Sequence, residues 1–292
     1  MSPGRGISLC EYSTFPATLA EDLAAYRAAG AGGIGLIEAK VRADPDARAR
    51  VKDSGLTVTN CVTIGSAVLP GRRGVSSPDE QIERLSDGIR LLATFEPVCV
   101  YFRLGGFGER EPEAARRLAC EGLRAVADVG RAAGVRLGIE VVSRAEASFA
   151  TTIADAAAVL DEAGTGSAVG LVVDTFHLHH IAGWEPELPR YADRLVGVQI
   201  GDRRAHERSP WDRAIPGEGI TDIPHMLAVV EQAGWDGWYD IEIVSDNGFF
   251  GEPLEGSYWE LPPVELASRA VAGVQAAWAV RTATSPGGGT PS

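Results

Sequence analysis

The sequence predicts a single α/β domain folded as a (β/α)8 TIM barrel. Eight short apolar runs alternate with segments whose apolar residues recur at helical spacing. The chain has 292 residues, and a barrel of this type needs about 250 without splitting into domains. No stretch with the composition of a linker divides the chain, so residues 1–280 are expected to form the barrel.

The expected strands are apolar, often β-branched runs bounded by turn signals. They cover residues 7–9, 34–37, 56–64, 98–104, 135–141, 169–173, 195–200 and 238–244. The expected helices end at glycines such as Gly30 and Gly55, or begin near a proline such as Pro78. They cover residues 18–29, 44–54, 78–95, 113–133, 153–163, 186–192, 223–233 and 264–280. Residues 281–292 are rich in Gly, Pro, Ser and Thr and are expected to be a disordered tail.

Composition and charge exclude several classes of function. Lys and Arg number 27 against 40 acidic residues, and the net charge of −13 disfavours nucleic-acid binding. No apolar run approaches the roughly 20 residues of a membrane span, and the N-terminus lacks the apolar core of a signal peptide. A cytoplasmic protein is therefore expected. The four cysteines are widely spaced, which favours buried free thiols over disulfides or a zinc site.

Four consecutive strand candidates each end in an oxygen-bearing side chain, namely Glu140, Asp174, Gln199 and Glu242. In a barrel these strands are neighbours, and the loops after them carry function. Buried carboxylates this close would repel one another unless a cation neutralised them. Oxygen ligands without thiolates favour one divalent ion, Mn²⁺ first and Mg²⁺ or Co²⁺ as alternatives. Each residue alone could also be an ordinary polar residue at a strand end.

Three further residues are candidates for substrate binding. His177 follows Asp174 by three residues and is expected at the barrel mouth, although the run HLHH could be only a polar turn and is no zinc motif. Glu146 lies near the same rim, with a solvated loop charge as the alternative. Arg213 precedes the turn IPGEG and could hold an anion or hydroxyls, or be a surface arginine.

The sequence resembles the xylose isomerase-like TIM-barrel superfamily, specifically its sugar-phosphate isomerase/epimerase branch. That branch includes ketose 3-epimerases, hydroxypyruvate isomerase and inosose isomerases and dehydratases. The resemblance rests on the runs LGIEVVSRAE, VVDTFHLHH, VGVQIGD, RAIPGEG and GWYDIEIV. It implies that Glu140, Asp174, Gln199 and Glu242 are metal ligands, and that the three further candidates above bind substrate.

Two departures distinguish this chain within the resemblance. Many epimerases have His where this chain has Gln199, whereas the hydroxypyruvate isomerase pattern VQIAD fits VQIGD better. The loop 202–213 is longer than the epimerase loop and carries Trp211, which could reshape specificity.

The DNA-repair endonucleases of the superfamily use a three-zinc site rich in His. Five histidines, three of them in one turn, do not readily supply that site.

The resemblance implies an isomerase or epimerase acting on a carbohydrate or polyol through a cis-enediolate. Glu140 and Glu242 would be the catalytic acid/base pair. Two alternatives stay open: a dehydratase or lyase acting on a keto-sugar or inosose, including C-glycoside cleavage, and a non-catalytic sugar-binding barrel subunit. The aromatic loop 245–263 could be a lid on the substrate, an oligomer contact or a packed surface loop. The resemblance makes a homodimer or homotetramer possible.

Overall fold

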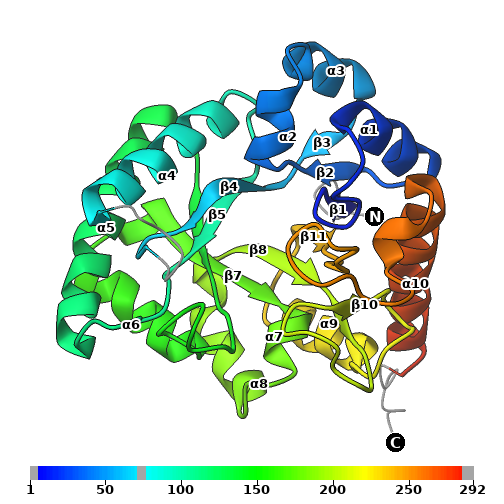
Figure 1. Cartoon of the computed structure of the whole chain (residues 1–292). Coiled ribbons are helices and arrows are strands. Elements are labelled where there is room, and N and C mark those ends of the chain that lie inside the picture. Colours follow the sequence, from blue (N-terminus) through cyan, green and yellow to red (C-terminus); the bar gives the residue numbers. More distant parts are fainter. Residues whose placement is uncertain (1–5, 71–76, 285–292) are drawn as a thin grey trace, which may run out of the picture.

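The computed structural model describes residues 6–70 and 77–284 as one barrel ringed by helices (Figure 1). Its strands are β1 (Gly6–Cys10), β2 (Gly33–Gly35), β3 (Thr57–Val58), β4 (Asn60–Ala67), β5 (Cys99–Arg103), β6 (Leu137–Glu140), β7 (Val169–Asp174), β8 (Leu195–Ile200), β9 (Asp202–Arg203), β10 (Arg213–Ala214) and β11 (Trp238–Ile241).

The α-helices are α1 (Leu19–Ala28), α2 (Glu38–Ala43), α3 (Ala47–Ser54), α4 (Pro78–Ala93), α5 (Pro112–Ala133), α6 (Ile153–Ala163), α7 (Thr175–Leu178), α8 (Trp184–Glu187), α9 (Ile223–Gln232) and α10 (Pro263–Thr284). Short 3-10 helices are η1 (Gly166–Ala168), η2 (Leu188–Arg194) and η3 (Tyr258–Glu260). Helix α10 therefore continues into the expected tail, and residues 285–292 lie outside the described residues. Within the described ranges, no helix is long and apolar enough to cross a membrane.

The barrel sheet is parallel throughout, with the strand order β3-β2-β1-β11-β8-β7-β6-β5-β4. The expected third strand is divided into β3, which pairs with β2, and β4, which pairs with β5. A parallel bridge between Ile37 and Val62 closes the ring between these two halves. The nine strands thus occupy the eight positions of the predicted TIM barrel, and the fold class is confirmed.

The core has two parts, as expected when side chains alternate across a closed sheet. A large cluster lies between the sheet and the helices. A small cluster fills the barrel interior with Ile37, Val62, Cys99, Tyr101, Val172 and Val196. All four cysteines are buried and free. The small interior leaves room at one end for polar side chains.

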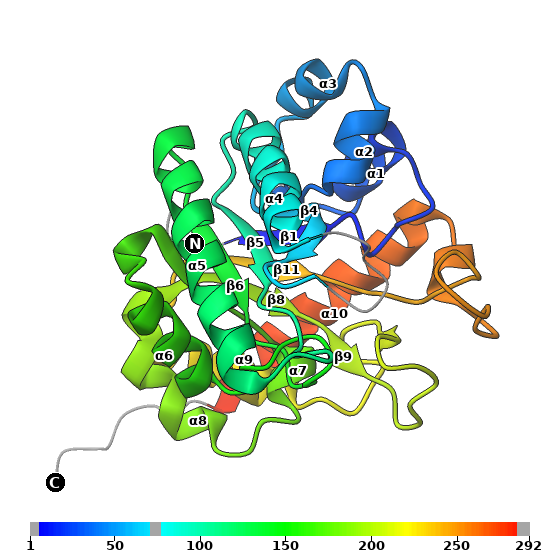
Figure 2. The same ribbon diagram turned by 60° about the vertical axis from the view of Figure 1, so that its left-hand side comes forward.

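Buried polar side chains also lie near the strand beginnings, such as Asn60 at the start of β4, but three buried carboxylates lie at the end where the parallel strands finish. The loops that follow β8 and β11 project from this end, in yellow-green and orange in Figure 2. The first loop contains the antiparallel pair β9 and β10, and the second contains η3. Side chains at the strand ends and side chains on these loops therefore share one space.

Candidate metal and substrate site

Four polar side chains converge where strands β6, β7, β8 and β11 end. Glu140 and Asp174 are the last residues of β6 and β7, and Glu242 directly follows β11. Gln199 lies opposite Asp174 in the register of β7 and β8. Asp174 and Gln199 are fully buried, whereas Glu140 and Glu242 are 7% and 6% exposed. The structure thus brings together the four residues predicted as metal ligands.

Hydrogen bonds fix one half of this group. The amide Nε2 of Gln199 donates to Glu242 Oε2 and, at 3.1 Å, to the hydroxyl of Tyr101. The Tyr101 hydroxyl in turn donates to Glu242 Oε2 at 3.3 Å. The other amide atom, Gln199 Oε1, is buried and accepts no hydrogen bond from the described residues. An acceptor left without a donor in a dry interior is costly, and a cation would satisfy it.

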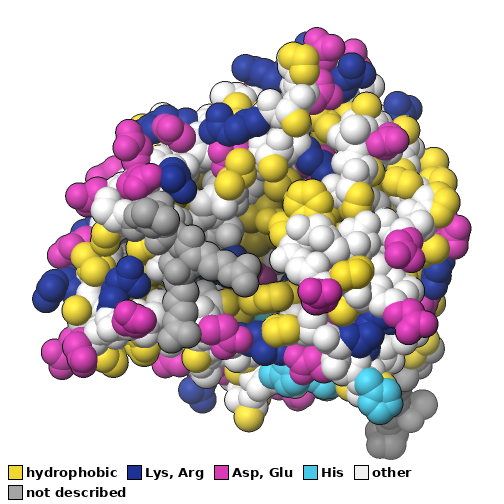
Figure 3. Space-filling model, in the orientation of Figure 1, with side chains coloured by type: hydrophobic (Ala, Val, Ile, Leu, Met, Phe, Trp, Pro, Cys, Tyr) yellow, Lys and Arg dark blue, Asp and Glu magenta, His cyan; other side chains and the backbone are white. Residues whose placement is uncertain are grey.

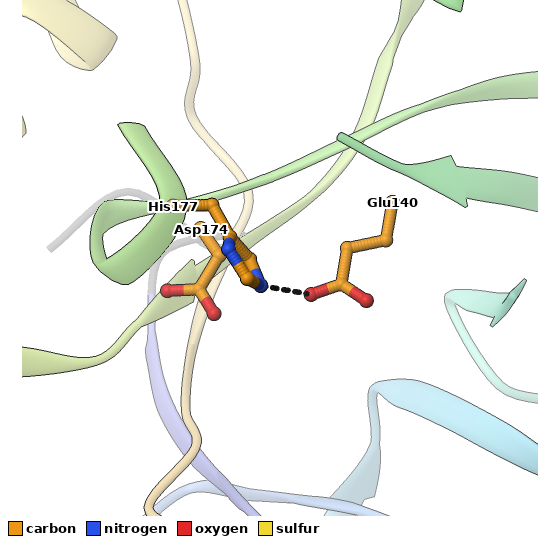
Figure 4. Close-up of side chains that lie close together, drawn as sticks. All are labelled: Glu140, Asp174 and His177. Carbon is orange, nitrogen blue, oxygen red and sulfur yellow. Dashed lines mark ion pairs between the residues drawn. The ribbon is translucent and has the colours of Figure 1, made fainter. Parts of the chain in front are cut away.

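His177 belongs to the other half of the group (Figure 4). Its Nε2 lies 3.6 Å from Glu140 Oε1, and one potential ligand atom from each of Glu140, Asp174 and His177 lies within 4.8 Å of the other two. The backbone N–H of Phe176 donates to Asp174 Oδ1 at 2.9 Å and so orients that carboxylate. Burial, and then the charge of Arg213, lower the pKa of His177 well below its usual range. The imidazole is therefore neutral and could bind a metal or a substrate hydroxyl.

The carboxylates of Glu140, Asp174 and Glu242 together carry more negative charge than the neighbouring Arg213 offsets. Burial, followed by the charges of Glu242 and Asp174, raises the pKa of Glu140 to about 8, although Arg103 and Arg213 oppose this shift. Burial also raises the pKa of Glu242. Carboxylate and amide oxygens are the donors that hard divalent ions take, and a neutral imidazole adds a ligand common to Mn²⁺, Co²⁺ and Zn²⁺. The donor set and the orphaned Gln199 Oε1 both fit a divalent ion.

Arg213 is buried among the carboxylates, so it is not a surface arginine. Its Nη1 is 2.6 Å from Asp174 Oδ2 and 3.8 Å from Glu242 Oε2, and the residue is 2% exposed. Asp174, Glu242 and Glu140 raise the pKa of Arg213, although its burial alone would lower it. The guanidinium is thus a permanent counter-charge for residues predicted to hold the metal.

The β9–β10 pair positions this arginine. Arg213 pairs with Arg203 across the two strands, and its backbone N–H donates to the carbonyl of Val244 at 2.8 Å. The carboxylate of Asp202 accepts hydrogen bonds from the backbone N–H groups of Gly217, Gly219 and Thr221, each at 2.9 Å. These bonds fold the predicted long loop back onto the barrel end.

A cavity of about 500 Å³ opens above the group, and Figure 3 shows the hollow in the middle of this face. Its lining combines the charged group with aromatic residues from both long loops. The lining includes Tyr12, Ser66, Tyr101, Arg103, Glu140, His177, Ser209, Trp211, Arg213, Glu242, Asp246 and Phe250. A cavity of this size accommodates a small organic ligand.

Of the three residues predicted to bind substrate, Glu146 is the one that the structure leaves outside the cavity lining. Its side chain is 65% exposed and lies 3.5 Å from Arg144. Conversely, sequence reasoning missed Tyr101 and Arg103, both on β5 and both lining the cavity. The signal was present, because a tyrosine and an arginine interrupt an otherwise apolar strand, VCVYFRL.

Comparisons with known proteins agree with this geometry. The model of the family described as "Xylose isomerase-like TIM barrel" matches residues 23–272. A protein of Streptomyces coelicolor named "Putative hydroxypyruvate isomerase" is 27% identical over 235 residues, covering 76% of this chain and 80% of its own. An L-ribulose 3-epimerase of a Methylomonas species is 26% identical over 176 residues, covering 59% of this chain and 58% of its own.

Solved structures share the fold. The zinc-bound IOLI protein superposes with a TM-score of 0.77 at 17% identity, covering 94% of this chain and 99% of its own. The match of the family model extends over most of the barrel, from α1 to α10. Together with the convergent strand ends, it shows that the chain belongs to the xylose isomerase-like TIM barrel family.

Proposed function

We propose that this protein is a divalent-metal-dependent isomerase or epimerase that moves a proton next to the carbonyl of a carbohydrate. The names of its relatives support a carbohydrate isomerase or epimerase. The observation that carries the proposal is the group of three buried carboxylates and one orphaned amide oxygen at the strand ends, from which Glu140 and Glu242 line the cavity.

Glu140, Asp174, Gln199 and Glu242 would hold the ion, with His177 as an additional donor within reach of two of them. Mn²⁺ is the ion we expect first, with Mg²⁺ or Co²⁺ as alternatives. When bound, the ion would polarise the carbonyl and the adjacent hydroxyl of the substrate and make the intervening C–H bond acidic.

Glu140 and Glu242 supply the proton transfer. Both line the cavity, whereas Asp174 and Gln199 are completely buried. One glutamate removes the proton beside the carbonyl and leaves an enediolate. Return of a proton to the neighbouring carbon isomerises the sugar, and return to the same carbon from the opposite face epimerises it. His177, which also lines the cavity, would hold a substrate hydroxyl, and Arg213 balances the charge of the carboxylates.

The test is solvent deuterium exchange. The wild-type protein with Mn²⁺ should incorporate deuterium from D₂O into ketose or keto-acid substrates at the carbon beside the carbonyl, as observed by NMR. Glu140→Gln and Glu242→Gln should each abolish this exchange and leave the far-ultraviolet circular dichroism spectrum unchanged. Glu162→Gln, on the outside of the barrel, is the matched control and should exchange normally.

Three results would contradict the proposal. Exchange at the wild-type rate in either active-site variant would remove that glutamate from the mechanism. An unsaturated product, formed with loss of water or of a β-substituent, would instead assign a dehydratase or lyase. Purified protein that retains no stoichiometric divalent ion and does not bind added Mn²⁺ would favour a non-catalytic sugar-binding barrel.

A further inference from the structure

Arg103, the last residue of β5, lines the cavity beside the proposed metal site. Its guanidinium is held from one side by Ser66. Nη2 donates to Ser66 Oγ at 2.8 Å and Nε donates to the Ser66 carbonyl at 3.4 Å. The guanidinium carbon also lies 5.6 Å from the centre of the Trp211 ring, within the range of a cation–π contact. The cation is therefore fixed in place.

The four arginines of the loop that follows β8 are paired with acids. Arg213 pairs with Asp174, Arg203 with Glu207, and Arg204 and Arg208 with Asp212. In the part of the chain that the structure describes, no carboxylate lies within 4.0 Å of the Arg103 guanidinium. Arg103 is thus a positioned positive charge at the cavity wall, still available for an ion pair.

The geometry of the remaining donors indicates what would pair with it. A guanidinium has five N–H groups, and Ser66 takes one on Nε and one on Nη2. Both N–H groups of Nη1 and one of Nη2 are left. Donors on Nη1 and Nη2 form the end-on fork that matches the two oxygens of a carboxylate.

A phosphate fits this wall less well than a carboxylate. A phosphate group at neutral pH carries close to two negative charges and three acceptor oxygens. The same cavity also contains Glu140, Glu242 and Asp246, which oppose a second negative charge. One free arginine and one serine hydroxyl match a single negative charge.

We propose that Arg103 binds a carboxylate of the substrate and thereby selects keto acids or sugar acids over neutral sugars. This inference rests on the proposed function for one point. The carbonyl and the hydroxyl of the bound substrate must lie beside the side chains of Glu140 and Glu242. Arg103 is a specificity-determining residue in this scheme, and it takes no part in the proton transfer.

The experiment compares matched ligands in the presence of Mn²⁺. Two carboxylate ligands are each paired with a neutral counterpart: hydroxypyruvate with dihydroxyacetone, and fructuronate with fructose. Fructose 6-phosphate tests binding of a phosphate. Isothermal titration calorimetry gives Kd, and deuterium exchange gives KM and kcat. The variants are Arg103→Gln and Arg103→Lys. Arg110→Gln is the control, because Arg110 is also half-buried, donates to the carbonyls of Pro70 and Phe107 and lies outside the cavity lining.

Wild-type protein should bind at least one carboxylate more tightly than its neutral counterpart. Arg103→Gln should raise Kd and KM for that carboxylate about 10- to 100-fold, which corresponds to the loss of a charge-assisted bidentate pair. The neutral ligands should change less than about twofold. Arg103→Lys should recover part of the loss, because it restores the charge but not the fork. Arg110→Gln should behave as wild type.

The outcomes separate this inference from the proposed function. If Arg103→Gln selectively loses carboxylate binding while no ligand exchanges deuterium, the assignment of Arg103 stands and the proposed reaction fails. If exchange proceeds but wild type shows no preference for either carboxylate, the assignment of Arg103 is wrong. The assignment of Arg103 is also wrong if Arg103→Gln weakens the binding of charged and neutral ligands equally. A preference of the wild-type protein for fructose 6-phosphate over fructuronate would likewise overturn the assignment.

Discussion

Arg213→Met is the substitution that most directly tests the charge balance at the barrel end. It removes the guanidinium that lies 2.6 Å from Asp174 and 3.8 Å from Glu242, and keeps an apolar chain against the ring of Phe176. Loss of one partner from a buried ion pair costs about 3–5 kcal/mol. For a chain of 292 residues, an unfolding entropy of about 2.1 cal/mol/K per residue converts that loss into a Tm lower by roughly 5–8 °C.

A divalent ion should reverse much of this loss. Mn²⁺ at 100 times its Kd stabilises a protein that binds it by about 2.7 kcal/mol. The variant should gain more than wild type, because Asp174 and Glu242 have lost their counter-charge and attract the ion more strongly. The measurement is thermal unfolding by circular dichroism, in EDTA and over a series of Mn²⁺ concentrations, with calorimetry for Kd.

Arg204→Met is the matched control. Arg204 pairs with the buried Asp212, which keeps Arg208 as a second partner and lies outside the candidate metal site. Its loss should lower Tm only slightly and should leave the Mn²⁺ gain at the wild-type value. The reasoning is refuted if metal-free Arg213→Met melts with wild type, or if Mn²⁺ protects the two variants equally.

Two further predictions concern buried polar groups. Tyr101→Phe removes the hydroxyl that is hydrogen-bonded to both Gln199 and Glu242 and so orients them. The substitution should weaken Mn²⁺ binding about 10- to 100-fold in calorimetry with little change in Tm. An unchanged affinity for Mn²⁺ would exclude this orienting role of Tyr101. Burial, more than the charge of Asp22, raises the pKa of Glu11 well above its usual range in spite of Lys40. The folded protein therefore keeps a proton that the unfolded chain releases above about pH 4.3, so stability falls as pH rises from there to the folded pKa. Glu11→Gln removes this dependence, and its advantage over wild type should grow by about 1.4 kcal/mol per pH unit across that window in urea unfolding. An advantage that does not vary with pH would contradict the assignment.

The strand-end residues could be predicted because a parallel barrel gathers the ends of all its strands at one rim. Glu140, Asp174, Gln199 and Glu242 converge as the sequence pattern indicates. Which of these residues lie opposite one another on neighbouring strands was harder to predict from the sequence. The register between β7 and β8 shifts between Leu171 and Val172, and this shift sets Gln199 opposite Asp174. Such a register shift depends on packing between strands and has no signal in the local sequence.

Residues on loops were harder to place than residues on strands. The ion pairs of Arg213 depend on the β9–β10 pair and on the hydrogen bonds of Asp202 to backbone groups up to 19 residues away. Glu146 was expected near the rim, but the loop after β6 leaves its side chain in solvent. Its role in substrate binding stays a prediction. Arg103 was missed because a charge at the end of an apolar strand reads as the start of the next loop.

The buried position of Arg213 has a consequence for how the protein matures. Because the arginine already balances Asp174 and Glu242, the chain can reach its native form before any ion arrives. If the proposed metal dependence holds, a shortage of metal in a cell would leave folded but inactive molecules rather than degraded ones. Supplying the ion would then activate these molecules within the time of diffusion and binding, without new protein synthesis.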